Sequence, residues 1–208
     1  IELTPEGVKH CIDTAGMGFC FAPAFHPAFR FAAPSRREIG IPTVFNLLGP
    51  MANPGRVRRQ VIGVANAAFA ERMVETLRTH GSVHAWVVHG GGLDELTTTG
   101  VSQVIELRDG EIDHFTVDPA ELGLPAARNA DLSGGDPAEN AEVVRRVFGG
   151  EFGPHRDIVV LNAGAGLVVG GKAVSLAAGV ALASDAIDRG AAAETLRKLV
   201  AASQEAAA

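Results

Sequence analysis

The segment between residues 60 and 89 constrains the fold more than any other part of the chain. Residues 60–65 (QVIGVA) are an apolar run typical of a buried strand, and residues 67–79 have the pattern of an amphipathic helix. Residues 84–89 (HAWVVH) are a second apolar run, followed directly by three glycines. A strand, a helix and a strand at this spacing predict a βαβ unit with parallel strands.

A β-hairpin is predicted immediately afterwards. Residues 101–107 and 111–117 are strand candidates on either side of Asp109-Gly110, a pair that favours a two-residue turn. This antiparallel ribbon interrupts the alternation of strands and helices. The expected fold is one α/β domain over residues 1–208, with a central, mostly parallel sheet, an antiparallel hairpin and helices on both faces.

The N-terminal quarter is predicted to be built from short elements. Thr4 as an N-cap, with Pro5 at the first helical position, begins a helix that ends near Gly16. After it come a strand candidate, two helical pieces and an apolar run too short to distinguish helix from strand, at residues 18–22, 27–31, 34–39 and 43–48 respectively.

Helices dominate the C-terminal part of the chain. Residues 136–139 (DPAE) are a capping box with proline at the first helical position, beginning a helix that runs to about Phe148. Residues 157–204 are alanine-rich and predicted to be helical, with breaks at Gly170-Gly171 and Gly190.

Composition limits the class of protein. The 208 residues, 47% hydrophobic and 20% charged, are enough for one sizeable globular core. The sequence contains neither an apolar run long enough to cross a membrane nor a signal segment at its start. Cys11 and Cys20 form no disulfide or metal framework, which favours a reduced, cytoplasmic protein. A net charge of −6 argues against nucleic acid as the main partner.

The start of the chain is unusual. The first residue is Ile1 rather than Met, and a helix-start pattern follows almost at once. We therefore expect an N-terminal part to be missing, through processing, proteolysis or the choice of expressed segment.

Residues 25–55 combine basic side chains with rigid turns. His26, Arg30, Arg36 and Arg37 lie within twelve residues, and several Gly and Pro residues follow them. Fixed guanidinium groups beside a rigid turn suit a site for an anionic small molecule. The arginines could instead form an exposed helix face, and Arg30 and Arg37 share one face only if the helix is continuous. By itself, His26 suits a structural hydrogen bond better than a general base.

Residues 90–100 (GGGLDELTTTG) place two carboxylates after an apolar strand. Ligands bind at the carboxyl ends of strands in open parallel sheets, and Asp94 and Glu95 lie at this edge. Adjacent carboxylates suit Mg²⁺, which takes one or two of them and shares its remaining positions with water and substrate phosphates. From spacing alone, two solvated acids in a polar loop are the simpler interpretation, because such a pair is common in loops.

Residues 162–166 (NAGAG) are not a dinucleotide-binding motif. The third glycine of such a motif would fall at Val169. Small residues that allow close helix packing are the better interpretation.

Five segments distributed along the chain carry a resemblance to a known family. They are ELTPEGV, GFCFAPAFHPAFR, APSRREIGIPTVFNLLGPMANP, the GLDE turn and LNAGAGL. In this order they resemble the C-terminal α/β portion of the anthranilate phosphoribosyltransferases, over essentially the whole chain. Residues 25–55 and GLDE are highly specific, whereas LNAGAGL is weak. The resemblance implies a nucleoside phosphorylase/phosphoribosyltransferase type of fold.

The resemblance also implies an activity and its site residues. The family transfers the phosphoribosyl group of PRPP to the amino group of anthranilate, releasing pyrophosphate, in tryptophan biosynthesis. Arg36 matches the arginine that binds the anthranilate carboxylate, and His26 and Pro50 match residues lining the anthranilate channel. Asp94 and Glu95 match the acidic pair that holds Mg²⁺ against PRPP. No catalytic acid or base is assigned, because a neutral anilino nitrogen is already a competent nucleophile.

Several family features have no counterpart here. These are the GTGGD loop, the KHGN segment and the helical N-terminal domain. A second departure from the family is the triple glycine before Leu93, which could loosen the metal loop. We expect residues 1–208 alone to be inactive and the complete enzyme to be a cytoplasmic homodimer. A pyrimidine-nucleoside phosphorylase-like enzyme and a non-catalytic ligand-binding remnant are the alternatives. Arg36 argues against the first, because it favours a carboxylate-bearing acceptor.

Overall fold

The computed structural model describes residues 1–31, 33–40, 49 and 51–207. Its contacts divide into two compact units. The first contains residues 1–56 and 191–208, and the second contains residues 57–190. The expected single domain over residues 1–208 stays a prediction, because the grouping of contacts does not show which parts fold independently.

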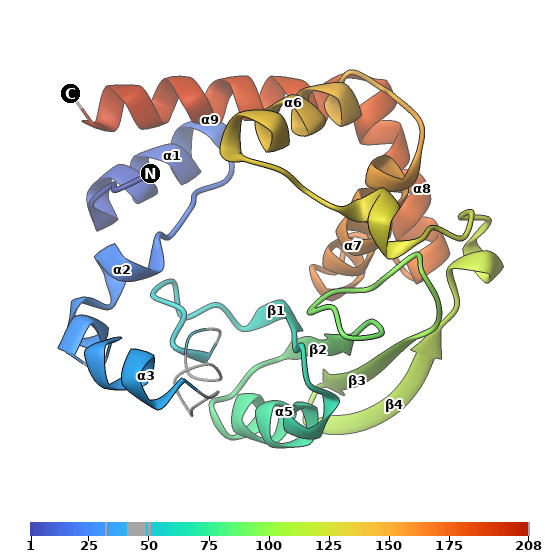
Figure 1. Cartoon of the computed structure of the whole chain (residues 1–208), viewed down its shortest axis with the longest axis horizontal. Helices are drawn as coiled ribbons and strands as arrows, with labels where there is room; N and C mark the ends of the chain where they lie inside the picture. Colours follow the sequence, from blue (N-terminus) through green and yellow to red (C-terminus); the bar gives the residue numbers. More distant parts are fainter. Residues whose placement is uncertain (32, 41–48, 50, 208) are drawn as a thin grey trace. The chain divides into compact units, whose positions relative to one another are not determined.

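The second unit is built on a four-stranded sheet (Figure 1). Its strands, in the order β1-β2-β3-β4, span Arg59–Gly63, His84–His89, Ser102–Arg108 and Glu111–Val117. β1 and β2 are parallel, and η2 (Ala67–Phe69) and α5 (Ala70–Thr79) connect them, which confirms the βαβ unit. The other pairings among the described strands are antiparallel, so the parallel part of the sheet is smaller than predicted. A parallel pairing needs a long crossover, whereas a glycine-rich loop without a helix joins β2 to β3.

The predicted hairpin connects β3 and β4. Arg108 and Glu111 are directly opposite each other, so the turn contains only Asp109 and Gly110. Both turn residues have positive φ angles, 51° and 92°, as a two-residue turn of the type I′ class requires. The short sequence signal therefore determines both the turn and the register of this ribbon.

Helices cover both faces of the centre of the sheet. α5 contacts β2 and β3, whereas α7 (Pro154–Val169) contacts β1 and β2, and Figure 1 shows the two helices on opposite sides of the strands. Successive side chains of a strand point to opposite faces, and residues 84–88 of β2 are all buried. This confirms the expectation of helices on both faces.

Two 3-10 helices and two further α-helices complete the second unit: η3, η4, α6 and α8 span Pro119–Leu122, Asn129–Leu132, Pro137–Phe148 and Leu176–Asp188. α6 begins at the predicted capping box, in which the side chains of Asp136 and Glu139 both accept backbone hydrogen bonds. α7 and α8 cross at glycines, because a β-carbon on Gly164 would lie 2.7 Å from the amide nitrogen of Val180. Residues 162–166 therefore do allow close helix packing.

The first unit contains α1 (Pro5–Ala15) packed against α9 (Ala191–Ala207). The amide of Gly7 donates a hydrogen bond to Oγ1 of Thr4 at 3.2 Å, which confirms the predicted N-cap. Cys11 is fully buried on α1. None of the described helices in either unit is both long and apolar enough to cross a membrane.

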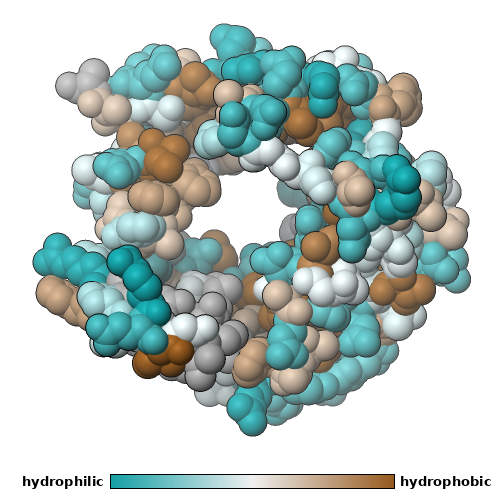
Figure 2. All heavy atoms as spheres, in the orientation of Figure 1, coloured by the Kyte–Doolittle hydropathy of each residue, from teal (hydrophilic) through white to brown (hydrophobic). Residues whose placement is uncertain are grey.

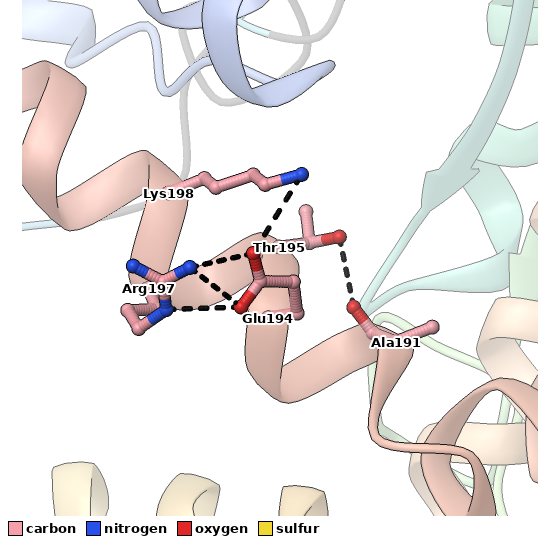
Figure 3. A network of polar contacts seen from close by, with 5 residues as sticks. All are labelled: Ala191, Glu194, Thr195, Arg197 and Lys198. Carbon is pink, nitrogen blue, oxygen red and sulfur yellow. Dashed lines mark hydrogen bonds and ion pairs between the residues drawn. The ribbon is translucent and has the colours of Figure 1, made fainter.

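The exposed side of α9 carries a polar network (Figure 3). The guanidinium group of Arg197 donates to both carboxylate oxygens of Glu194, at 2.6–2.9 Å, and Lys198 lies 3.7 Å from the same carboxylate. Thr195 donates to the carbonyl oxygen of Ala191. Because these side chains are exposed, water screens the ion pairs, and they contribute little to the stability of the helix.

The remainder of the first unit consists of short helices: α2, η1 and α3 span Ala22–Phe25, Pro27–Phe31 and Ala33–Ile39. The strand predicted at residues 18–22 is wrong, because residues 18–21 form no regular element and α2 begins at Ala22. Pro23 in the first turn of α2 fits a helix start and could not donate to a sheet. The run at residues 43–48 lies outside the described residues. In Figure 2, at the lower left, hydrophilic surface lies over part of α3.

Candidate functional site

The loop after β2, residues 90–100, begins with a closed turn. Gly90 and Leu93 exchange two backbone hydrogen bonds, each 3.1 Å long. Gly91 and Gly92 have φ angles of 60° and 98°, which residues with a β-carbon rarely adopt. The three glycines therefore allow this closed turn, and the expectation that they could loosen the loop stays a prediction.

Two glycines provide space for the backbone of the acidic pair. A β-carbon on Gly63 of β1 would lie 1.5 Å from the carbonyl oxygen of Asp94. A β-carbon on Gly90 would lie 2.4 Å from the carbonyl oxygen of Glu95. Both separations are far below van der Waals contact, so a larger residue at either position would displace the loop.

The two carboxylates have different environments. Asp94 is exposed, whereas Glu95 is half-buried. Burial raises the pKa of the Glu95 carboxyl, and the neighbouring negative charge of Asp94 raises this pKa further. A cation bound between the two carboxylates would oppose both effects, because it favours the ionised form of each.

Asn162 of α7 holds the residue that follows the acidic pair. Its Oδ1 accepts a hydrogen bond from the amide of Leu96 at 3.0 Å, and its Nδ2 donates to the carbonyl oxygen of Leu96 at 2.8 Å. Nδ2 also lies 3.4 Å from Oε2 of Glu95. Sequence reasoning assigned Asn162 only to helix packing. The signal for this role was a single amide among the apolar and small residues 158–169 of α7, since a half-buried amide needs partners for the atoms that water does not reach.

Hydroxyl groups order the remainder of the loop. The amide of Thr97 donates to Oγ of Ser102 at 3.0 Å, and Oγ1 of Thr97 accepts from the amide of Thr99 at 3.0 Å. Thr97, Thr98 and Ser102 are fully buried. The loop therefore has a defined conformation, although it is a connection outside the carboxyl end of β2.

The donor set of this loop fits a shared Mg²⁺. Among the described residues, no group of three or more His, Cys, Asp or Glu side chains gathers as a closed metal site. Two adjacent carboxylates, one exposed and one half-buried, suit an ion that completes its shell with water and substrate phosphates. The metal site at Asp94 and Glu95 stays a prediction with which this geometry is consistent.

The three residues expected to bind anthranilate belong to the first unit or lie outside the described residues. His26 is half-buried at the C-cap of α2, where its amide donates to the carbonyl oxygen of Ala22 at 2.9 Å. The backbone of Arg36 lies on α3. Pro50 lies outside the described residues. Their roles therefore stay predictions.

The neighbouring arginines occupy different elements. Arg30 lies on η1 and Arg37 on α3, so their seven-residue spacing does not place them on one continuous helix. Both side chains are exposed. The guanidinium carbon of Arg30 lies 4.8 Å from the centroid of the Phe31 ring, a cation–π contact.

Comparison with protein families identifies the chain. The family described as "Glycosyl transferase family, a/b domain" matches residues 1–193. The chain belongs to this family. The residues that match this glycosyl transferase a/b domain include both the acidic loop, residues 90–100, and Asn162.

Similar proteins share one name. The chain is 50% identical over 200 residues to the anthranilate phosphoribosyltransferase of Mesorhizobium japonicum, covering 96% of this chain and 60% of the relative. It is 51% identical over 203 residues to that of Parvibaculum lavamentivorans, covering 97% and 60%. The chain therefore spans about 60% of the length of these curated relatives.

Solved structures agree with the fold of the glycosyl transferase a/b domain. The anthranilate phosphoribosyltransferase of Thermus thermophilus matches with a TM-score of 0.91 at 43% identity, covering 98% of this chain and 60% of that one. The Saccharomyces cerevisiae enzyme in complex with PRPP and Mg matches with a TM-score of 0.89 at 24% identity, covering 98% and 59%. At that identity the yeast structure supports the fold alone.

Proposed function

We propose that the natural protein containing this chain transfers the phosphoribosyl group of PRPP to the amino group of anthranilate. The products are N-(5-phosphoribosyl)anthranilate and pyrophosphate, and the reaction belongs to tryptophan biosynthesis. The observation that carries this proposal is the 50% identity to an anthranilate phosphoribosyltransferase over 96% of the chain. A protein of this kind is a glycosyltransferase, in agreement with the family.

Asp94 and Glu95 are proposed to hold Mg²⁺ against PRPP. When bound, the ion supplies positive charge to the pyrophosphate, on which negative charge accumulates as the glycosidic bond breaks. Glu95 must be ionised for this role, although burial raises the pKa of its carboxyl. Exposed Asp94 leaves one side of the pair open to water and substrate phosphates. The yeast enzyme of the same fold forms a complex with PRPP and Mg, and the proposal gives this chain the same ion.

Arg36 is proposed to bind the carboxylate of anthranilate, with His26 and Pro50 lining the path of this substrate. A planar guanidinium group matches a carboxylate with two parallel hydrogen bonds and so fixes the orientation of an aromatic acid. Orientation is the main requirement, because a neutral anilino nitrogen can attack the anomeric carbon without a strong base. The segment APSRREIGIPTVFNLLGPMANP, which contains Arg36 and Pro50, supports this part of the proposal.

A substrate assay tests the proposal. The natural protein, with any flanking chain retained, is incubated with PRPP, anthranilate and Mg²⁺, and the formation of phosphoribosylanthranilate is followed by the loss of anthranilate fluorescence. We expect turnover that requires all three components. Phosphorolysis of a pyrimidine nucleoside, with no use of anthranilate, would replace this proposal by the phosphorylase alternative.

We propose a cytoplasmic homodimer as the working form of the protein. Cys11 is buried and Cys20 is exposed, and both are free thiols, which a reducing compartment preserves. Sedimentation equilibrium of the natural protein tests the dimer, since a mass equal to one chain at all concentrations would contradict it.

A further inference from the structure

The side-chain amide of Asn162 pairs with the backbone of Leu96 in both directions. Oδ1 accepts from the Leu96 amide at 3.0 Å and Nδ2 donates to the Leu96 carbonyl oxygen at 2.8 Å. These partners determine which end of the amide is oxygen, because the Leu96 amide needs an acceptor and the carbonyl needs a donor. The pairing joins residues that are 66 positions apart in the chain.

A third hydrogen bond fixes the amide on its own helix. Nδ2 donates to the carbonyl oxygen of Ile158, one turn earlier in α7, at 3.0 Å. Leu96 is fully buried, so the group that Asn162 holds is itself anchored in the core. Neither partner of this contact can move far without breaking hydrogen bonds that are partly buried.

Fixing Leu96 limits the freedom of Glu95. The two residues share a planar peptide bond, so the backbone of Glu95 is held on its C-terminal side by Asn162. On the other side, the carbonyl oxygen of Asp94 lies against Gly63. The acidic pair is therefore held both from β1 and from α7.

The longest contact of the amide is the one with the carboxylate. Nδ2 has two hydrogens and three neighbouring acceptors, and Oε2 of Glu95, at 3.4 Å, is the most distant of them. A contact of this length orients the carboxylate without using its full capacity to accept hydrogen bonds. Carboxylate oxygens of Glu95 thus remain available to a cation.

We propose that Asn162 is a positioning residue for the metal loop: it holds Leu96 so that Glu95, together with Asp94, presents its carboxylate to a divalent cation. This inference rests on the proposed metal site, and it assigns to α7 a role in cation binding beyond helix packing. Partners that orient metal ligands typically contribute about 10–100-fold to metal affinity.

Mn²⁺ is the probe for this role, because carboxylate sites that accept Mg²⁺ also accept Mn²⁺ and its binding is read by electron paramagnetic resonance without turnover. The natural protein, with any flanking chain retained, is titrated with Mn²⁺ in the presence of PRPP. We expect Asn162→Ala to raise the dissociation constant for Mn²⁺ by about 10–100-fold. Anthranilate KM at saturating Mg²⁺ should change much less.

Asn140 provides a matched control. It makes the same two-way pairing with the backbone of Gly135, accepting from its amide at 2.9 Å and donating to its carbonyl oxygen at 3.0 Å. Asn140→Ala therefore removes an equivalent pair of hydrogen bonds from a loop outside the proposed metal site. We expect the Mn²⁺ dissociation constant of this variant to equal that of the wild type.

A second variant keeps the test decisive if Asn162→Ala does not fold. In Asn162→Ser the hydroxyl can still donate to the Ile158 carbonyl oxygen four residues earlier, but it is too short to span Leu96. We expect weaker Mn²⁺ binding in this variant, together with faster hydrogen exchange at the Leu96 amide. Wild-type Mn²⁺ affinity in folded Asn162→Ser would overturn the positioning role.

The metal site itself is tested separately with Asp94→Asn combined with Glu95→Gln. If this double variant binds Mn²⁺ as the wild type does, the proposed metal site fails and the role of Asn162 fails with it. If the double variant loses Mn²⁺ binding while Asn162→Ser retains it, only the positioning role is wrong.

Discussion

The carbonyl oxygen of Asp94 lies 1.5 Å from the point that a β-carbon on Gly63 would occupy. β1 and the acidic loop are therefore in backbone contact at this position, and the contact depends on the absence of a side chain at residue 63. Because the contact involves backbone atoms on both sides, a change of rotamer cannot relieve a clash here.

We predict that Gly63→Ala displaces the acidic loop and destabilises the fold. The cost should reach about 3 kcal/mol, the upper part of the usual range for overpacking. Urea unfolding measures this loss, and Mn²⁺ binding measures the displacement of the carboxylates. Gly166→Ala is the control, since a β-carbon there meets nothing within 4 Å and its effect should stay within about 1 kcal/mol. Equal stabilities of the two variants would contradict the contact.

We predict that neutralising the acidic pair weakens the use of Mg²⁺. Asp94→Asn with Glu95→Gln should raise the Mg²⁺ concentration needed for half-maximal PRPP turnover by at least about 10-fold, because the ion loses both protein carboxylates. The control is Glu111→Gln with Asp113→Asn, two exposed acids on β4 that change the net charge equally. An unaltered Mg²⁺ titration in the first double variant would reject the metal assignment.

We predict that Arg36→Ala acts on the acceptor substrate. A charge-assisted hydrogen-bonded pair contributes about 1.5–3 kcal/mol, so the anthranilate KM should rise by roughly 10–100-fold. The PRPP KM should change little. Arg37→Ala, the adjacent arginine on α3, serves as the control and should leave both constants near their wild-type values. If Arg37→Ala has the larger effect on anthranilate, the assignment belongs to that arginine.

We predict a pH dependence that originates at Glu95. Its pKa is raised above the ordinary value of 4.5, first by burial and then by Asp94. Between the pKa of Glu95 in the unfolded chain and its higher pKa in the folded chain, the folded chain holds a proton that the unfolded chain has lost. The free energy of unfolding therefore falls as pH rises through this interval. Glu95→Gln abolishes this contribution. Without divalent cations, the free energy of unfolding of the variant should therefore increase relative to that of the wild type as pH rises from about 4 to about 8.

Urea unfolding at both pH values measures the effect, with Glu142→Gln, an exposed acid on α6, controlling for the lost charge. Saturating Mn²⁺ should reverse the order of stability, because the cation favours the ionised carboxylate that only the wild type contains. A wild-type advantage that grows with pH in the absence of cations would contradict the raised pKa.

Local signals in the sequence predicted most individual elements. The N-cap at Thr4, the capping box at residues 136–139 and the turn at Asp109-Gly110 all lie where they were expected. Each depends on hydrogen bonds or backbone angles within a few residues, so the neighbouring sequence is sufficient to specify it. The strand predicted at residues 18–22 failed, because apolar composition alone does not supply a neighbouring strand with which to pair.

The acidic pair was also visible in the sequence, as two carboxylates after a buried strand. The support of that pair was not visible. Asn162 is 66 residues from Leu96, and Gly63 precedes Asp94 by about half of that distance. The sequence by itself thus determined most of the elements, the hairpin and the candidate metal ligands, because these follow from local chemistry. Only the tertiary structure decided how the acidic loop is held, because that depends on contacts between β1, the loop and α7 that form when distant segments pack together.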